Sequence, residues 1–446
     1  MRTSRSTVPG LVVALIAIIL AAGLLTTTAA QSRLSSSQHW VATWGTAQLA
    51  YRAPAPPAPA SPPVPPAPAP TPAPGTPQRR FGIPRALPGL SNQTIRMVVR
   101  TSIGGSQVRI RVAQAFGAPA VTIGSAHIAT RADGASIVAG SDRMLTFSGK
   151  PAATLYAGQV LVSDPVALDV RPLSDLAVSL FFPGETGPPT GHTFGLRPTY
   201  VSTSGDTTGS AAMTDLATTA ESYYWLSGVD VVAPAASGTL VTFGDSITDG
   251  DQSTPDTLGM WPAVLATRLQ AGRATSGVGV VNAAISGNRV LGDNNSGLAR
   301  LWRDVLAVPG VRWMTMMEGI NDITGATRSG QAGKTFTAET LIAAYRQVIE
   351  AAHAQGIRVI GCTLTPYGGS NVFTEEGEAI RQAVNTWIRT GNGFDGVIDF
   401  DMATRDPQTP TRFRVEADSP DLLHPANPGY ALMARAVDLT LFTRLR

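Results

Sequence analysis

The sequence has little cysteine, which forms disulfide bonds, and little lysine, which supplies positive charge. It contains one cysteine in 446 residues, Cys362, and only two lysines, Lys150 and Lys334. A single cysteine excludes an intrachain disulfide, and the surrounding IRVIGCTLTP predicts a buried strand in which Cys362 is a core residue. The remaining positive charge is arginine without a dense basic run, and the formal net charge is +3. This distribution argues against nucleic-acid binding.

The N-terminus predicts export. Arg2 and Arg5 precede an unbroken apolar run from Leu11 to Leu25, and the small and polar residues TTTAAQS follow. A basic start, an apolar middle and a small-residue cleavage site are typical of a secretory signal peptide, here residues 1–30. The alternative is an uncleaved membrane anchor, for which the run is short. We therefore expect a secreted protein, extracellular or periplasmic, with no stable membrane insertion after cleavage.

Residues 52–78 are dense in proline, which forbids a helix or a central strand and favours an extended polyproline segment. Only about twenty residues separate this segment from the predicted cleavage site, too few for a domain. Because those residues include VATWGTAQ, which predicts a strand, we interpret the proline-rich segment as a surface excursion inside the first domain.

The first domain, residues 31–235, is predicted to be an antiparallel β-sandwich or jelly roll. TIRMVVRTS and QVRIRVAQAF alternate apolar and polar residues, with Val108 and Ile110 on one face and Arg109 and Arg111 on the other. Further short runs of this kind are separated by Gly, Pro, Asp and Ser. Many short strands at this spacing are typical of such folds.

The second domain, residues 236–446, is predicted to be an α/β domain. Five strand-like segments alternate with helical ones: TLVTFGDS, VGVVNAAIS, VRWMTMMEGIND, IRVIGCTLTP and GVIDFDMA. The clearest helix, TAETLIAAYRQVIEAAHAQG, places five apolar side chains on one face: Leu341, Tyr345, Val348, Ile349 and Ala352. This alternation predicts a doubly wound, mainly parallel five-stranded sheet covered on both faces.

Polar residues follow the predicted strands, and ligands bind at the carboxyl ends of strands in such sheets. Ser246 follows the first strand and could be a nucleophile or only the N-cap of the next helix. Of the five histidines, only His424 lies beside a carboxylate, Asp421, at an expected sheet edge. Asp421 could hold the Nδ1 proton of His424 while Nε2 accepts the Ser246 proton, or it could only cap the last helix.

Acyl transfer also needs hydrogen-bond donors for a developing oxyanion. Gly287 follows the second strand and can present its N–H, Asn321 follows the third and offers its amide, and the Ser246 N–H is a third donor. Each segment could also be an ordinary strand-end turn, since Gly, Asn and Asp favour turns. Their joint occurrence at successive strand ends is what the turn interpretation leaves unexplained.

GDSITDG, the glycine of ISGN, GIND and DLLHP resemble, in this order, the four signature blocks of the SGNH (GDSL-type) serine esterase/lipase family. The resemblance spans about residues 236–446 and implies a flavodoxin-like fold. It implies that Ser246 is the nucleophile, His424 the base and Asp421 the carboxylate that orients the base. It also implies that the oxyanion donors are Ser246, Gly287 and Asn321. WVATWGTAQ and VRTSIGGSQVRIRVAQAFG are similar to the N-terminal region of some secreted bacterial members. No Gly-x-Ser-x-Gly occurs, which disfavours an α/β-hydrolase.

The sequence therefore predicts a secreted serine hydrolase of small-molecule or polymer-borne carboxylic esters that uses an acyl-enzyme and no metal or organic cofactor. One alternative is a metal-dependent phosphoesterase, because the same segments hold possible ligands: Asp245, Asp249, Asn321, Asp322 and His424. The other is a non-catalytic extracellular glycan-binding protein, because jelly-roll-like domains bind sugars and the β-rich domain could contact a cell wall or glycan. The acyl and alcohol specificity is not defined by the sequence.

Overall fold

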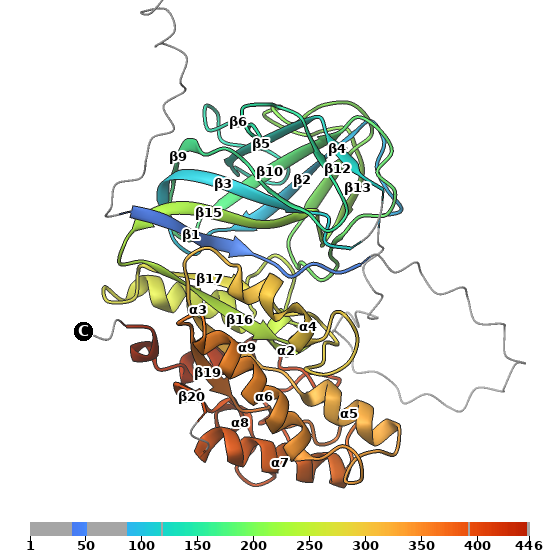
Figure 1. Cartoon of the computed structure of the whole chain (residues 1–446), viewed down its shortest axis with the longest axis vertical. Coiled ribbons are helices and arrows are strands. Elements are labelled where there is room, and N and C mark those ends of the chain that lie inside the picture. Colours follow the sequence, from blue (N-terminus) through green and yellow to red (C-terminus); the bar gives the residue numbers. More distant parts are fainter. Residues whose placement is uncertain (1–37, 51–86, 117–118, 391–392, 444–446) are drawn as a thin grey trace, which may run out of the picture.

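A β-rich part and an α/β part are formed by the residues that the computed structural model describes (Figure 1): 38–50, 87–116, 119–390 and 393–443. The predicted signal peptide, residues 1–30, and the proline-rich segment, residues 52–78, lie outside the described residues. Within the described ranges, no helix is both long and apolar enough to cross a membrane.

The β-rich part consists mainly of two antiparallel sheets. The first has the order β1, β15, β3, β8, with β9 also paired to β3: Gln38–Gly45, Leu226–Pro234, Gly105–Ala113, Val160–Val162 and Val166–Val170. The second has the order β13, β12, β2, β10, β5, β6: Leu216–Ala220, Thr199–Ser202, Gln93–Arg100, Asp175–Phe182, Ser125–Thr130 and Arg143–Leu145. Two short pairs are β11 with β14 and β4 with β7: Gly191–His192, Tyr223–Tyr224, Val121–Ile123 and Ala153–Leu155. One hydrophobic cluster takes buried residues from both sheets, including Ile110 and Val178, and the predicted antiparallel β-structure is confirmed.

The α/β part is built on a five-stranded parallel sheet. Its order is β17, β16, β18, β19, β20: Val278–Asn282, Gly238–Gly244, Val311–Met317, Arg358–Cys362 and Gly396–Ile398. Every neighbouring pair is parallel, which confirms the predicted parallel sheet. The helices α2 to α9 are, in order, Ser246–Asp249, Trp261–Ala271, Gly297–Leu301, Ile320–Arg328, Ala338–His353, Glu375–Thr390, Phe400–Thr404 and Asn427–Ala436. A π-helical turn, η1 (Trp302–Leu306), follows α4, and a 3-10 turn, η2 (Leu439–Phe442), follows α9.

Alternate strand residues of this sheet face two separate hydrophobic clusters. On one face, Phe243 belongs to a cluster with Val348 of α6 and Val384 of α7. On the other face, Leu240 belongs to a cluster with Leu265 of α3 and Met433 of α9. A parallel sheet covered on both faces needs strands that are apolar throughout, and β16 is buried along its whole length.

The strand predicted for GVIDFDMA is wrong in its second half. GVIDFDMA forms only the short strand β20, and the chain enters α8 at Phe400. Asp399 explains the change, because its Oδ1 accepts the backbone N–H of Met402 as an N-cap. The same carboxylate accepts two hydrogen bonds from Arg389, which hold it at the start of the helix.

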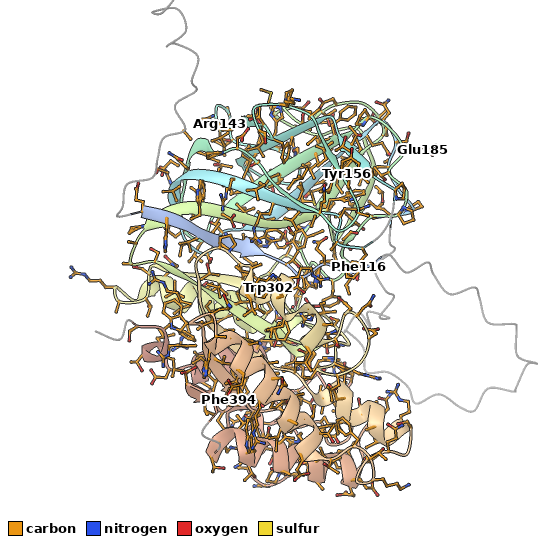
Figure 2. The ribbon with its side chains drawn as sticks, viewed as in Figure 1. Phe116, Arg143, Tyr156, Glu185, Trp302 and Phe394 are labelled. Carbon is orange, nitrogen blue, oxygen red and sulfur yellow. The ribbon has the colours of Figure 1, made fainter. Side chains whose placement is uncertain are left out.

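The two parts contact each other along β1, which lies next to β17 (Figure 1). Ser102, just after β2, accepts the backbone N–H of Val280 in β17 at 2.8 Å. Phe116 of the β-rich part lies at the same junction (Figure 2). The guanidinium of Arg303 in η1 stacks 5.0 Å over its ring. The edge strand β17 of the α/β sheet is therefore covered by the β-rich part.

Candidate active site

Ser246 begins α2 directly after β16. The turn is tight, because a Cβ on Gly244 would lie 2.5 Å from a backbone oxygen of β18, and Gly250, which ends the helix, has a φ of +106°. The N-cap is Asp245, whose Oδ1 accepts the backbone N–H of Ile247 at 3.1 Å. The capping role considered for Ser246 thus belongs to its neighbour, and the Ser246 hydroxyl has a different partner.

His424 links Ser246 to Asp421. Its Nε2 lies 2.8 Å from Ser246 Oγ, and its Nδ1 lies 2.7 Å from Asp421 Oδ2. Asp421 Oδ1 accepts the backbone N–H groups of Leu423 and His424 at 2.9 and 3.0 Å, which fixes the carboxylate. Leu422, inside this turn, has a φ of +58°, a strained conformation for leucine. Three of the predicted site residues therefore form one hydrogen-bonded chain.

The ionisable groups of this chain have shifted pKa values. Burial alone would raise the pKa of Asp421, but the hydrogen bond and charge of His424 lower it well below 3.8. Burial alone would lower the pKa of His424, but the hydrogen bond to Asp421 and the charge of Asp251 raise it above 6.5. Asp251, which the sequence analysis missed, lies 3.7 Å from His424 Nε2. The surroundings therefore stabilise a positive charge on the imidazole.

Gly287 lies in the loop after β17, with a φ of +77°. The residue before it, Ser286, donates its backbone N–H and its hydroxyl to Asp249 Oδ2 at 2.8 and 2.7 Å. Asp249 is the last residue of α2, the helix that Ser246 begins. The loop that carries Gly287 is therefore fastened to the helix of Ser246.

Asn321 and Asp322, at the start of α5 after β18, hold the other side of the same loop. Asn321 Nδ2 donates to the backbone oxygen of Asn288 at 2.9 Å. The Asp322 carboxylate accepts the backbone N–H groups of Val290 and Leu291 at 2.9 and 3.0 Å. A side-chain amide has two N–H donors, so this contact leaves the second one of Asn321 for another partner. Ser246, Gly287 and Asn321 thus follow the carboxyl ends of β16, β17 and β18, and His424 reaches Ser246 from the loop between α8 and α9.

Buried carboxyl groups lie behind the site. Burial raises the pKa of Asp245 to about 7, that of Asp322 to about 6 and that of Glu318 to about 8. The fully buried Arg300 of α4 lies 3.6 Å from Glu318 Oε1 and stacks 3.9 Å over the ring of Phe243. Glu318 directly precedes GIND in the sequence, but no sequence signal marks Arg300 as its neighbour. The sequence analysis therefore did not predict the contact between Arg300 and Glu318.

The ligands considered for a metal site contact different partners. Asp249 accepts from Ser286, Asp322 accepts from two backbone N–H groups, and His424 contacts Ser246. In the part of the chain that the structure describes, no group of three His, Cys, Asp or Glu side chains is arranged to hold a metal ion. The donor set of the phosphoesterase alternative is not assembled there.

Residues 242–432 match the family model of the GDSL-like lipase/acylhydrolase family. The chain carries a GDSL-like lipase/acylhydrolase domain. This confirms the resemblance that the four motifs indicate, and all five predicted site residues lie inside the matched segment. The name of the family describes lipases and acylhydrolases.

Solved structures similar to the chain include a GDSL-like lipase from Bacteroides thetaiotaomicron, with 18% identity, coverage of 46% of this chain and 87% of that chain, and a TM-score of 0.32. A catalytic mutant of an acetylxylan esterase from Geobacillus stearothermophilus has 24% identity, coverage of 47% and 97%, and a TM-score of 0.35. A comparison with curated proteins gave no match.

Proposed function

We propose that the protein is a secreted serine ester hydrolase that cleaves carboxylic esters through an acyl-enzyme on Ser246. The observation that carries this proposal is the hydrogen-bonded chain from Asp421 through His424 to Ser246 Oγ, with contacts of 2.7 and 2.8 Å. A serine becomes nucleophilic when a base in contact removes its proton during attack and a third group orients that base. The GDSL-like match supports ester hydrolysis as the reaction class.

In the first half of the proposed reaction, Ser246 Oγ bonds to the ester carbonyl carbon while His424 Nε2 takes its proton. Asp421 keeps the proton on Nδ1 and stabilises the imidazolium. The carbonyl oxygen becomes an oxyanion, and we assign as its donors the backbone N–H groups of Ser246 and Gly287 and the second N–H of the Asn321 amide. These donors act most strongly on the charge that develops in the transition state, so they raise kcat.

The tetrahedral intermediate then collapses to complete acylation, and water removes the acyl group in the second half. His424 Nε2 first gives its proton to the leaving alcohol as the ester C–O bond breaks, which leaves an acyl group on Ser246. His424 then takes a proton from a water molecule whose oxygen attacks the acyl carbon, and it returns this proton to Ser246 Oγ. The scheme balances with water as the only co-reactant and uses no metal or organic cofactor.

We further propose that removal of residues 1–30 releases the protein to the periplasm or the extracellular space. Residues 236–446, with a doubly wound flavodoxin-like sheet, would form the catalytic domain, and residues 31–235 a β-sandwich or jelly-roll domain that contacts cell wall or glycan. The substrate would be a small-molecule or polymer-borne carboxylic ester, and nucleic acid is not a partner. The apolar run near the N-terminus and the low net charge of +3 support these proposals.

Hydrolysis of p-nitrophenyl acetate by the purified protein tests the proposed reaction. Ser246→Ala is expected to lower kcat by about 10³-fold or more, because nucleophile and base act as a unit. Ser276→Ala, at an exposed position, is the control with unchanged activity, and excess EDTA leaves the wild type active. Equal rates for Ser246→Ala and wild type would reject the serine mechanism.

The same assay separates the two alternatives. Loss of wild-type activity in EDTA would favour the metal-dependent phosphoesterase. A wild-type protein that is inert toward esters but is retained on a polysaccharide column would favour the glycan-binding protein.

A further inference from the structure

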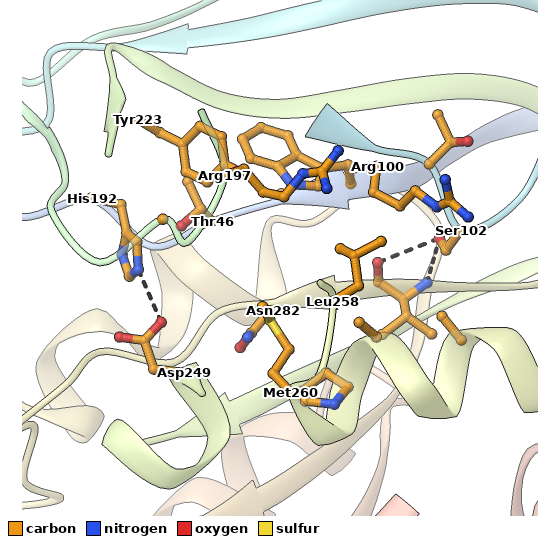
Figure 3. A pocket seen from close by; sticks show the side chains of 18 of the residues that line it. Thr46, Arg100, Ser102, His192, Arg197, Tyr223, Asp249, Leu258, Met260 and Asn282 are labelled. Atoms are coloured by element: carbon orange, nitrogen blue, oxygen red, sulfur yellow. Dashed lines mark hydrogen bonds and ion pairs between the residues drawn. The ribbon is translucent and has the colours of Figure 1, made fainter. Parts of the chain in front are cut away.

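A second histidine–aspartate pair joins the β-rich part to α2, the helix that Ser246 begins. His192, in β11, is 3% exposed, and its Nε2 lies 3.0 Å from Asp249 Oδ1 (Figure 3). Its Nδ1 lies 3.0 Å from the backbone oxygen of Ala47. A carbonyl and a carboxylate oxygen can only accept, so both ring nitrogens donate and His192 is held as an imidazolium. The pair therefore joins a cation of one part to an anion of the other.

The surroundings fit these charges. Burial alone would lower the pKa of His192, but the charge of Asp249 and the hydrogen bonds to Asp249 and Ala47 raise it above 6.5. Asp249 is also 3% exposed, and a buried carboxylate without a counter-ion would be costly. His192 is the histidine partner that holds this side chain in place.

Asp249 also binds the loop after β17 that carries Gly287, through its second carboxylate oxygen. Oδ2 accepts both the backbone N–H and the hydroxyl of Ser286, at 2.8 and 2.7 Å. The Gly287 N–H belongs to the planar peptide that begins at the Ser286 carbonyl, so with Ser286 held, its direction changes only by rotation about ψ of Ser286. An oxyanion donor acts only when it is aimed at the place where the charge develops. The contacts thus run from the β-rich part to a proposed oxyanion donor.

The position of His192 is itself well fixed. The neighbouring Gly191 exchanges two backbone hydrogen bonds with Leu49, at 2.7 and 3.1 Å, and β11 also pairs with β14. A cavity of about 100 Å³ lies beside the pair, between the two parts, and both His192 and Asp249 line it (Figure 3). This space would let the Asp249 side chain turn away from Ser286 if His192 were removed.

We propose, on the basis of the proposed function, that His192 is a positioning residue for ester hydrolysis. It holds Asp249 and, through Ser286, sets the direction of the Gly287 N–H. The β-rich part then completes the oxyanion hole of the other part.

The test compares His192→Ala and His192→Gln with His127→Ala. His127 forms a similar pair in the same part, with Nδ1 2.8 Å from Asp142 Oδ2, and it is the matched control. Each protein is titrated with a fluorophosphonate to count active serines, and kcat and KM are measured with p-nitrophenyl acetate. Inhibition by an alkyl trifluoromethyl ketone, which forms a tetrahedral oxyanion on serine, reports on the oxyanion hole itself.

His192→Ala is expected to lower kcat per active serine by about 10- to 100-fold with KM changed less than about threefold, because oxyanion contacts strengthen in the transition state. The inhibition constant of the ketone rises in parallel. His192→Gln, which keeps one N–H donor for Asp249, lies between His192→Ala and wild type, and His127→Ala equals wild type. A merely structural role would lower the number of active serines and leave kcat per serine unchanged.

Unchanged kcat per serine in His192→Ala, or an equal loss in His127→Ala, would overturn the inference. If His192→Ala does not fold, Ser286→Ala takes its place in the test, because this change removes one hydrogen bond to Asp249 and leaves the contacts between the two parts intact. Unchanged kcat and unchanged ketone inhibition in Ser286→Ala would also overturn the inference. Wild type and Ser246→Ala are assayed in parallel. An inactive wild type rejects the proposed function, whereas an active wild type with an equally active His192→Ala rejects only the role of His192.

Discussion

Asp251 Oδ2 lies 3.7 Å from His424 Nε2, the same ring nitrogen that contacts Ser246 Oγ. This separation is too long for a hydrogen bond, but the Asp251 side chain is only 14% exposed, so its charge is weakly screened. A carboxylate in this place favours the protonated imidazole. Asp251 therefore raises the pKa of His424, the base of the proposed mechanism.

Asp251→Asn is expected to move the acid limb of the kcat/KM profile to lower pH. The proposed mechanism needs neutral His424, and the Asp251 charge is one reason why its pKa is above 6.5. Removing that charge lowers the pKa and extends activity into more acidic conditions. The profile is measured with p-nitrophenyl acetate, and Asp133→Asn, an exposed aspartate of the β-rich part, should leave it unchanged. An acid limb in Asp251→Asn at the wild-type pH would contradict this account.

Asp421→Asn is expected to lower kcat by about 10²- to 10⁴-fold with little change in KM. An asparagine can present an N–H to His424 Nδ1, which favours the tautomer whose Nε2 carries the proton and cannot accept one from Ser246. Asp418→Asn, in the same loop, is the matched control, because Asp418 Oδ1 accepts the backbone N–H of Ser419 and does not contact His424. A loss of similar size in both variants would indicate a damaged loop and not a lost orienting group.

Gly287→Ala and Gly333→Ala are expected to cost similar stability but to differ in activity. Both glycines have positive φ, +77° and +70°, and a Cβ on either meets no atom within 4 Å, so alanine adds backbone strain of about 1 kcal/mol without a clash. Only Gly287 is a proposed oxyanion donor, and its variant should lose at least about tenfold in kcat. Urea unfolding and ester hydrolysis are measured on both. Full activity of Gly287→Ala would remove Gly287 from the proposed oxyanion hole.

Two buried glutamates should respond oppositely to replacement by glutamine. The carboxyl group of Glu318 accepts no hydrogen bond within the described residues, with Arg300 3.6 Å away, and burial raises its pKa to about 8. Glu378, in contrast, makes hydrogen bonds of 2.7 and 2.8 Å with Arg381. In wild type the folded state keeps a proton on Glu318 that the unfolded state loses near pH 4.5. Stability therefore falls as pH rises from about 4.5 to 8, by at most about 1.4 kcal/mol per pH unit.

Glu318→Gln does not titrate, so its stability relative to wild type should increase between pH 5 and pH 8. Glu378→Gln breaks a buried ion pair and should lose about 3–5 kcal/mol. Urea unfolding at the two pH values measures both effects. A stability difference between Glu318→Gln and wild type that is the same at both pH values would show that Glu318 does not titrate in this range.

The features that the sequence could predict are local in the chain. Asp421 and His424 are three residues apart in one turn, and their contact can be anticipated from that spacing. Ser246 follows an apolar strand, and the glycine and aspartate after that strand indicate where it ends. The parallel sheet and the helix α6 follow from hydrophobic periodicity in the same way. Short-range chemistry therefore sufficed for the sheet and for the positions of the proposed nucleophile and base.

The features that the sequence could not predict depend on distant residues. His192 and Asp249 are 57 residues apart and come from different parts, so no spacing rule connects them. In isolation His192 was one of four histidines without a visible partner. The start of α8 was missed for a related reason, because Asp399 is held as an N-cap by Arg389 of the preceding helix. These contacts exist only once the elements have packed.

The position of β1 bears on the order in which the molecule can be assembled. This strand pairs with β15, with Gln38 opposite Pro234, and lies next to β17. A growing polypeptide therefore presents β1 long before either neighbour has been synthesised. An unpaired strand is a template for incorrect pairing, so this interval is when the chain is most exposed to aggregation. The strand that is made first among these three is therefore the one that waits longest for its partners.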